Sequence, residues 1–292
     1  MRIRSIRASI LALPASIAAV LVLCVSASAQ SGPSSFLARY QARVSATQAA
    51  QPHWITPLVL VTPRLEQELR TDFVRQRNPT SQNIWIYDNG KGLELIPFRR
   101  VELLFNTPPF IAHDQKHVAD GFSDVTFLAK YRFYGSNEQH RNAIVTAFLG
   151  GSLPTGKSSN GSCCASITPT LAVGKGWRRL DLSSTAGGTL PVSNAARLGH
   201  QILWNSVAQY HAGRFFWPEF EINSTFFKGS ANDGKAQTFA TPGLVIGRIP
   251  LTHDAAGKPG RLGLTFGAGE QIALTRFHTY NHALVFTARL PF

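Results

Sequence analysis

The sequence predicts an all-β fold, a single antiparallel transmembrane β-barrel of about twelve strands. Three observations lead to this prediction. Apolar and polar residues alternate with a period of two through most of residues 62–292, residues 1–29 resemble a secretory signal peptide, and the final alternating run ends on the aromatic residue Phe292. Together these features indicate strands that lie in the outer membrane of a bacterium.

Residues 1–29 contain the parts of a signal peptide. Arg2, Arg4 and Arg7 form the charged start, residues 10–25 the apolar middle, and Ala27-Ser28-Ala29 the small-residue cleavage site. The alternative is a retained anchor helix, because the apolar run is slightly long for a signal. We predict export, cleavage near Ala29 and localisation in the bacterial outer membrane.

Composition narrows the class of protein. The formal net charge of +13 falls to +10 when the three arginines of residues 1–29 are removed. The positive charge is spread along the chain without a block of like charges, so we predict no nucleic-acid partner and a weak preference of the lumen for anions. After Gln30 no apolar run reaches the ~18 residues of a spanning helix, which excludes a polytopic helical protein.

Cys163 and Cys164 are the only cysteines after residue 29, and they are adjacent in a loop rich in Ser and Gly. Adjacent cysteines cannot join distant strands, and without nearby His or carboxylate residues they make a poor metal site. A local vicinal disulfide and an ordinary loop pair remain the alternatives. We predict no cofactor and no metal site.

Residues 30–61 precede the alternating region and are predicted to form a periplasmic arm. Phe36, Tyr40 and Val44 recur every four residues, which indicates a short helix over residues 35–49. The alternative is a disordered leader. The domain organisation is therefore a signal peptide at 1–29, an arm at 30–61 and a barrel at 62–292.

Twelve strands account for residues 62–292, and an even number brings both ends of a barrel to the periplasmic side. They are expected near residues 64–75, 84–96, 98–106, 122–134, 142–154, 165–175, 177–190, 200–211, 214–227, 237–249, 261–273 and 281–292. Links after even-numbered strands are mostly short, as in periplasmic turns, although residues 135–141 and 250–260 are longer.

Aromatic residues gather near the predicted strand ends, as expected for the girdles of a membrane barrel. The periplasmic girdle is predicted from Tyr131, Phe133, Tyr134, Trp177, Tyr210, Phe215, Phe216, Trp217 and Phe292, and the outer girdle from Phe226, Phe227, Phe239, Phe277 and Tyr280. A soluble sandwich would also alternate, but the packing of its core would not gather aromatic residues at strand ends.

Residues 151–158 match the phosphate-loop pattern Gly-x-x-x-x-Gly-Lys-Ser. That pattern binds nucleotides only when a helix begins at the lysine. Here a Ser/Gly-rich loop and the strand-like run Ile167-Thr-Pro-Thr-Leu follow, which cannot continue a helix. A nucleotide site is therefore not predicted.

The same region carries a family resemblance. Gly121-Phe-Ser-Asp124, Lys130-Tyr-Arg-Phe133, Leu153-Pro-Thr-Gly156 and Leu171-Ala-Val-Gly-Lys175 resemble a family of outer-membrane barrels named after the meta-cleavage pathway of phenol degradation. The resemblance implies a transporter-like barrel that passes small, often aromatic or hydrophobic, molecules. Residues 94–105 depart from the family pattern, because the usual glycine-containing turn is missing.

Charged residues inside the strands are expected to face the lumen, since a charge facing lipid is costly. The predicted pore-lining residues are Glu66, Glu68, Arg70, Asp124, Lys130, Arg132, Glu219, Glu221, Arg248 and Arg289. The alternative is mutual ion pairing that fills a narrow barrel, which loops or the N-terminal arm can also plug.

We predict a channel for small solutes and no catalytic residues, because none of the histidines lies in a nucleophile motif or has metal-ligand spacing within a strand. The alternatives are a closed structural or interaction barrel and an outer-membrane enzyme acting on lipids or esters. The expected partners are outer-membrane lipid, a small-molecule solute, and the barrel-assembly machinery, which would bind the C-terminal strand ending in Phe292.

Overall fold

The computed structural model describes residues 35–88, 92–157, 159–253, 257 and 259–292, so the predicted signal peptide lies outside the described residues. The chain divides after Ser45 into two compact units. Helix α2 (Phe36–Ala49) begins in the first unit and ends in the second, and it coincides with the helix that the four-residue period predicts. Among the described residues, no helix is long and apolar enough to cross a membrane.

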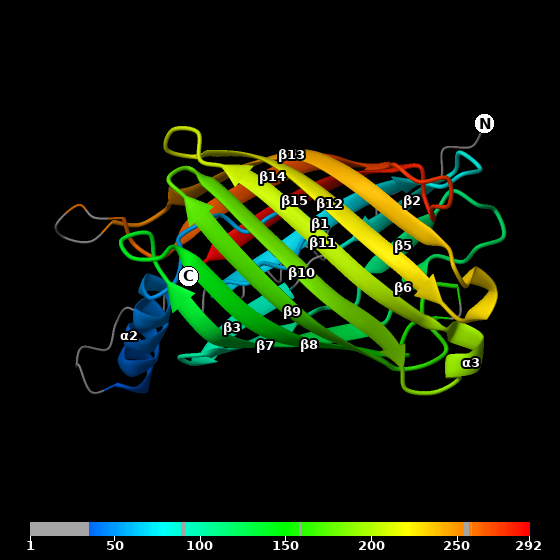
Figure 1. Ribbon diagram of the computed structural model, residues 1–292, viewed down its shortest axis with the longest axis horizontal. Coiled ribbons are helices and arrows are strands. Elements are labelled where there is room, and N and C mark those ends of the chain that lie inside the picture. Colours follow the sequence, from blue (N-terminus) through cyan, green and yellow to red (C-terminus); the bar gives the residue numbers. More distant parts are fainter. Residues whose placement is uncertain (1–34, 89–91, 158, 254–256, 258) are drawn as a thin grey trace. The chain divides into compact units, whose positions relative to one another are not determined.

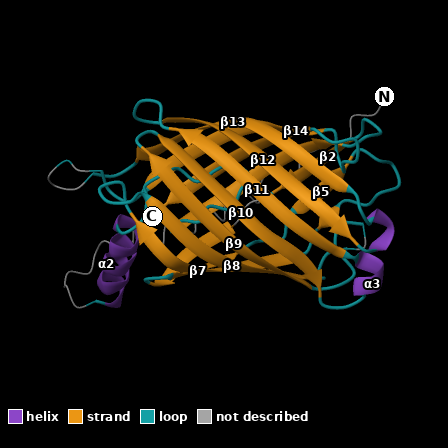
Figure 2. Ribbon diagram, in the orientation of Figure 1, coloured by secondary structure: helices purple, strands orange, loops and turns teal. Residues whose placement is uncertain are grey.

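The second unit contains one antiparallel sheet that closes on itself (Figures 1 and 2). Its strands are β1 (Glu68–Arg77), β2 (Asn83–Tyr87), β3 (Gly92–Phe98), β4 (Val101–Phe105), β5 (Phe110–His113), β6 (Gly121–Phe122), β7 (Val125–Ser136), β8 (Ala143–Leu153), β9 (Ser166–Trp177), β10 (Leu180–Pro191), β11 (His200–Tyr210), β12 (Phe216–Lys228), β13 (Ala236–Pro250), β14 (Gly263–Ala273) and β15 (His282–Pro291). Closure is made by β15, which pairs with β1 from Pro291 opposite Glu68 to His282 opposite Arg77.

The barrel has twelve strands, as predicted. Some of the twelve wall strands are interrupted and consist of two shorter strands in line. These are β2 with β3, which both pair with β1, β4 with β5, and β6 with β7. The strand predicted at 98–106 therefore extends to His113, with a break before Phe110. Pro108 and Pro109 explain this break, because proline has no N–H group to donate to the ladder.

The two faces of the sheet carry opposite kinds of side chain. On β7, Phe133 is 55% exposed on the outside, whereas the neighbouring Arg132 is buried. The same alternation exposes Trp177, Tyr210 and Phe220 on the outside of other strands. Large apolar side chains therefore cover the outside of the barrel and charged side chains fill its interior, the reverse of a soluble globular protein.

Some of the predicted girdle residues point into the barrel, among them Trp217, Phe239 and Tyr280. The alternation places Trp217 and Phe239 on the inner face, where both are buried. Trp217 stacks on His211 with ring centroids 4.0 Å apart, and Phe239 stacks on Tyr280 at 4.3 Å. The prediction placed these rings by their distance along the strand and did not apply the two-residue period to them.

The barrel has a terminus end and a loop end. Strand β1 begins and β15 ends at the terminus end, where the C label lies in Figure 1, together with the turns at residues 99–100, 137–142, 178–179, 211–215 and 251–262. The loop end carries residues 78–82, 114–120, 154–165, 192–199, 229–235 and 274–281, with α3 (Ala195–Leu198) and the 3-10 turn η2 (Ser230–Asn232). As predicted, most turns at the terminus end are short, and 137–142 and 251–262 are the longer ones.

Candidate functional site

Residues 51–67, here called the inner segment, join α2 to β1 and lie in the barrel interior. The segment has no helix or strand, yet most of its residues are buried. Buried backbone N–H and C=O groups need hydrogen-bond partners. The partners of these backbone groups are charged and polar side chains on the inner face of the strands. The stretch predicted as a periplasmic arm thus contributes residues 51–61 to the interior.

Two arginines bind the carbonyl oxygens of one turn in the inner segment. Arg289 on β15 donates to the carbonyl oxygen of Pro57 at 2.6 Å and also to that of Thr56. Arg70 on β1 donates to the carbonyl oxygens of Pro57, at 3.5 Å, and Leu58. Both arginine side chains are almost fully buried. They therefore replace the water that these carbonyl groups would otherwise bind.

Two glutamates bind the amide groups of the same turn. Glu219 on β12 accepts a hydrogen bond from the Leu58 amide at 2.9 Å. Glu221 accepts hydrogen bonds from the amides of Val59 and Leu60, at 2.8 and 2.7 Å. Carboxylates bind the N–H groups of the turn and guanidinium groups bind its C=O groups, so both kinds of backbone group are satisfied by charged partners.

Glycines on the wall make room for the inner segment. A Cβ atom added at Gly267 or Gly269 of β14 would lie 2.6 Å from the side chain of Leu58, and Gly243 on β13 is as crowded. Gly174 on β9 accommodates Trp54 in the same way, again at 2.6 Å. The inner segment therefore packs directly against the backbone of the strands.

A second charged cluster holds the end of the inner segment. The ammonium group of Lys130 on β7 lies 2.8 Å from a Glu102 carboxylate oxygen and 3.9 Å from one of Glu94, and all three side chains are 0% exposed. Lys130 also donates to the carbonyl oxygen of Arg64 at 3.2 Å, and Glu102 accepts a hydrogen bond from the Glu66 amide. The ion pairs of the wall thus also fix the inner segment.

The inner segment returns toward its own start through Gln51. The Gln51 side chain donates to the carbonyl oxygen of Leu65 at 2.8 Å and accepts from the Leu65 amide at 3.0 Å. Arg132 on β7 donates to the same Gln51 oxygen and to the Thr47 carbonyl, both at 2.9 Å. The bonds between Gln51 and Leu65 bring the two ends of residues 51–65 together, and Arg132 binds at this junction through Gln51.

The start of the inner segment is fixed at the terminus end. The ring of His53 lies 2.7 Å from the carboxylate of Glu138, which also accepts the His53 amide. The pKa of Glu138 falls to about 2: partial burial raises it, but the hydrogen bonds from His53 lower it by more. Trp54 donates its indole N–H to the side chain of Asn142, at 3.0 Å, in the same turn.

The structure gathers most of the predicted pore-lining residues around the inner segment. Glu66 belongs to the segment itself and lies 3.3 Å from Arg64, while Glu68 is buried on the inner face of β1. Arg70, Lys130, Arg132, Glu219, Glu221 and Arg289 all hydrogen-bond to the inner segment or pair beside it. Asp124 and Arg248 lie elsewhere.

Asp124 binds a loop at the loop end. Its carboxylate accepts the amides of Gly156, at 2.9 Å, and Ser162, at 2.8 Å, and the Ser162 hydroxyl at 2.5 Å. Gly156 of the phosphate-loop pattern thus binds a carboxylate of the protein, whereas Gly151 packs on Phe127, and the described residues around Lys157 form no helix.

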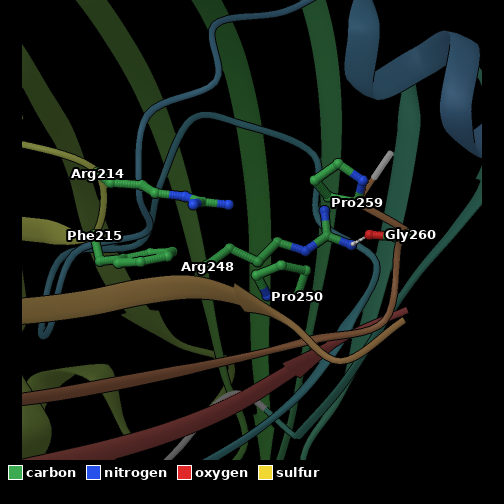
Figure 3. A pocket seen from close by; sticks show the side chains of 6 residues that line it. All are labelled: Arg214, Phe215, Arg248, Pro250, Pro259 and Gly260. Carbon is green, nitrogen blue, oxygen red and sulfur yellow. Dashed lines mark hydrogen bonds between the residues drawn. The ribbon is translucent and has the colours of Figure 1, made fainter. Parts of the chain in front are cut away.

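Arg248 lines a cavity of about 220 Å³ at the terminus end, with Arg214, Phe215, Pro250, Pro259 and Gly260. Figure 3 shows the guanidinium group of Arg248 pointing toward Gly260, while Arg214 extends into the same cavity from the turn 211–215. Arg248 donates to the carbonyl oxygen of Gly260 at 3.4 Å. This site is separate from the bonds that hold the turn Thr56–Leu60.

Sequence reasoning overlooked the central role of residues 54–60. Two signals were present: the apolar run from Trp54 to Val61 without any period, and glycines at inward positions such as Gly267 and Gly269. Within the described residues, no group of three or more His, Cys, Asp or Glu residues could hold a metal ion.

No family model and no curated protein matches the sequence. Among solved structures, the chain is similar to an outer membrane channel from Pseudomonas putida, with a TM-score of 0.57 and 13% sequence identity. The match covers 82% of this chain and 100% of that one. At this identity the similarity shows a common barrel fold.

Proposed function

We propose that the protein is an outer-membrane channel for small solutes, and that its inner segment controls passage. The observation that carries this proposal is the reversed arrangement of side chains: apolar residues outside and a charged interior. The solved barrel with the same fold, whose description is an outer membrane channel, supports it.

The outer face supports insertion into a membrane. Most of the long strands have 10 to 15 residues, enough to cross a bilayer on a tilt. Exposed aromatic residues lie near the terminus end, including Tyr131, Trp177 and Phe216. Charged residues on the lipid face would cost about 2–4 kcal/mol each near the midplane, and the strand charges that lie deepest are turned inward.

The inner segment is suited to a gate because, between its ends at α2 and β1, the described residues show no disulfide and no β-ladder that joins it to the wall. Its turn is bound through backbone atoms by Arg70, Arg289, Glu219 and Glu221. Charge-assisted hydrogen bonds of this kind contribute about 1.5–3 kcal/mol each, so the closed state is stable but reversible. A solute crosses when the turn leaves its position between the two pairs of side chains.

The solute class rests on two supports. The family resemblance of residues 121–175 implies small aromatic or hydrophobic molecules. An apolar cluster on the inner face agrees with it: Val74, Ile86, Ala283 and Val285 are packed together, with Tyr280 at their edge. An apolar wall within a polar interior favours a partly apolar solute over an inorganic ion.

Conductance in a planar bilayer tests the proposal. We expect the wild type to open rarely and the variant Glu219→Gln/Glu221→Gln to open at least about tenfold more often, because amides bind the turn less strongly than carboxylates. Glu270→Gln is the matched control, since its carboxylate pairs with His282 and not with the inner segment. Silence of every variant in a correctly inserted barrel would favour the closed structural barrel.

A further inference from the structure

Arginine occurs in every turn of the terminus end. Arg214 lines the cavity beside Arg248; the other exposed members are Arg99, Arg100, Arg141, Arg178 and Arg179, here called the arginine turns. They are distributed along the rim, because the turns join β3 to β4, β7 to β8 and β9 to β10. Such a distribution makes a row of positive charge rather than one patch.

These guanidinium groups have no carboxylate partners in the described part of the chain. The acidic side chain of the same turns, Glu138, is bound to His53. Arg261 in the turn 251–262 is engaged separately, since it donates to the carbonyl oxygen of Phe292 at 2.9 Å. The positive charge of the arginine turns is therefore available to an external anion.

The loop end has a different composition. Its loops carry the acids Asp114, Asp120 and Asp233 beside the bases Lys116, Lys157, Arg197, Lys228, Lys235 and Arg276. Both signs of charge are mixed there, and lysine is more common than arginine. The row at the terminus end is thus not explained by a basic chain as a whole.

One arginine occupies a backbone position that suits other residues better. Residues 178 and 179 form a two-residue hairpin turn, in which Arg178 has a φ of 55°. Turns of this kind favour Gly, which has no Cβ atom, or Asn, whose short polar side chain forms local hydrogen bonds at positive φ. An arginine at this position indicates that its side chain has a use.

Aromatic residues lie directly beside the arginine turns on the outer face. Phe98 precedes Arg99 and Trp177 precedes Arg178, and both rings are more than half exposed. Exposed aromatic rings on a membrane barrel lie at the level of the lipid headgroups, which places the neighbouring guanidinium groups at the depth of the phosphates.

We propose that the terminus end binds anionic phospholipid headgroups through the arginine turns. This inference rests on the proposed function, since it requires the barrel to span a bilayer. Guanidinium groups suit the task because their fork of N–H donors matches two phosphate oxygens at once, which a lysine cannot do. The ligand class is a phosphodiester lipid with net negative charge, in the leaflet that the terminus end faces.

The test uses the full-length protein in bilayer discs of phosphatidylcholine with and without phosphatidylglycerol. Native mass spectrometry of the released barrel counts the retained lipids. We expect wild type to retain at least about threefold more phosphatidylglycerol than phosphatidylcholine, with a preference that weakens as ionic strength rises. The variant R99Q/R100Q/R178Q/R179Q should lose the preference, whereas K116Q/K228Q/K235Q/R276Q at the loop end should keep it.

Equal retention of both lipids by the wild type would overturn the inference while the membrane barrel stands. The same holds if both glutamine variants behave alike. A wild type that inserts into neither kind of disc removes the proposed function, and this inference with it. If the arginine variant does not fold, the salt dependence of the wild type still decides, because binding through charge must weaken with screening.

Discussion

Arg70 and Arg289 lie directly opposite each other on β1 and β15, and both donate hydrogen bonds to the carbonyl oxygen of Pro57. Like charges in this position repel each other across a ladder. Asp72 reduces the repulsion, because its carboxylate binds Arg70 at 2.7 Å. The seam that closes the barrel and the turn that fills it therefore depend on the same two side chains.

Replacing Arg289 with methionine should weaken both the seam and the closed state. The change leaves the Pro57 and Thr56 carbonyl groups short of donors in a buried site, at a cost of about 1–3 kcal/mol. The temperature at which the compact band disappears on an unboiled gel should fall. Arg77→Met, at the exposed end of β1, is the control and should leave that temperature unchanged.

Adding a methyl group at Gly267 should displace the inner segment. Its Cβ atom would lie 2.6 Å from Leu58, and overpacking costs about 1–3 kcal/mol. We expect Gly267→Ala to open more often in a bilayer. Gly150→Ala serves as the control, because a Cβ at this inward glycine meets its neighbours at 3.5 Å or more. Equal opening of the two variants would contradict the packing argument.

The anchoring of His53 should depend on pH in a defined window. The pKa of Glu138 is lowered from 4.5 to about 2, so its contribution is complete above pH 4.5 and is lost as pH falls toward 2. Amide exchange at residues 51–55 should accelerate relative to the rest of the barrel between about pH 5 and about pH 3. In Glu138→Gln the relative rate should be the same at both pH values.

Asp124→Asn should loosen the loop at residues 154–165. An amide replaces a carboxylate that accepts three hydrogen bonds from Gly156 and Ser162, with a loss of about 1.5–3 kcal/mol. Maleimide should then label the buried Cys164 several-fold faster. Asp233→Asn, in the separate loop that contains η2, provides the comparison. Unchanged labelling in Asp124→Asn would show that the loop does not need the carboxylate.

Deleting Leu290–Phe292 should lower the amount of assembled barrel. Leu290 pairs with Leu69 in the seam, and the Phe292 amide donates to the carbonyl oxygen of Gln67 at 3.1 Å. Antibody detection in membrane fractions, compared with total synthesis, measures the effect. A Phe292→Tyr variant, which keeps the backbone bonds and the ring, should assemble normally.

The period of two allowed the sequence to predict the walls. On β7, Lys130 and Arg132 face inward and Tyr131 and Phe133 outward, as their alternation required. A strand's faces are set by neighbours along the chain, so a local pattern is sufficient. The break in the strand before Phe110 was not predicted, although Pro108-Pro109 indicates it, because proline cannot donate to a β-ladder.

The inner segment could not be derived in this way. Leu58 and Leu60 have no periodic partners, and their amides bind Glu219 and Glu221, 161 positions away. A sequence shows that these carboxylates face inward, but it does not show which atoms they meet. The charged residues of β1, β7, β12 and β15 that were predicted to line a pore lie buried on the inner face, but the sequence does not show that they bind the inner segment.

The bond between Arg289 and Pro57 spans 232 positions of the chain. Contacts of such separation form late, because a long loop must close before they are made. The turn at Pro57 is synthesised before any strand, and it can bind Arg289 only after β15 has paired with β1. During assembly the inner segment therefore lacks part of its set of hydrogen-bond partners, and the pairing of β15 with β1 that closes the barrel also completes that set.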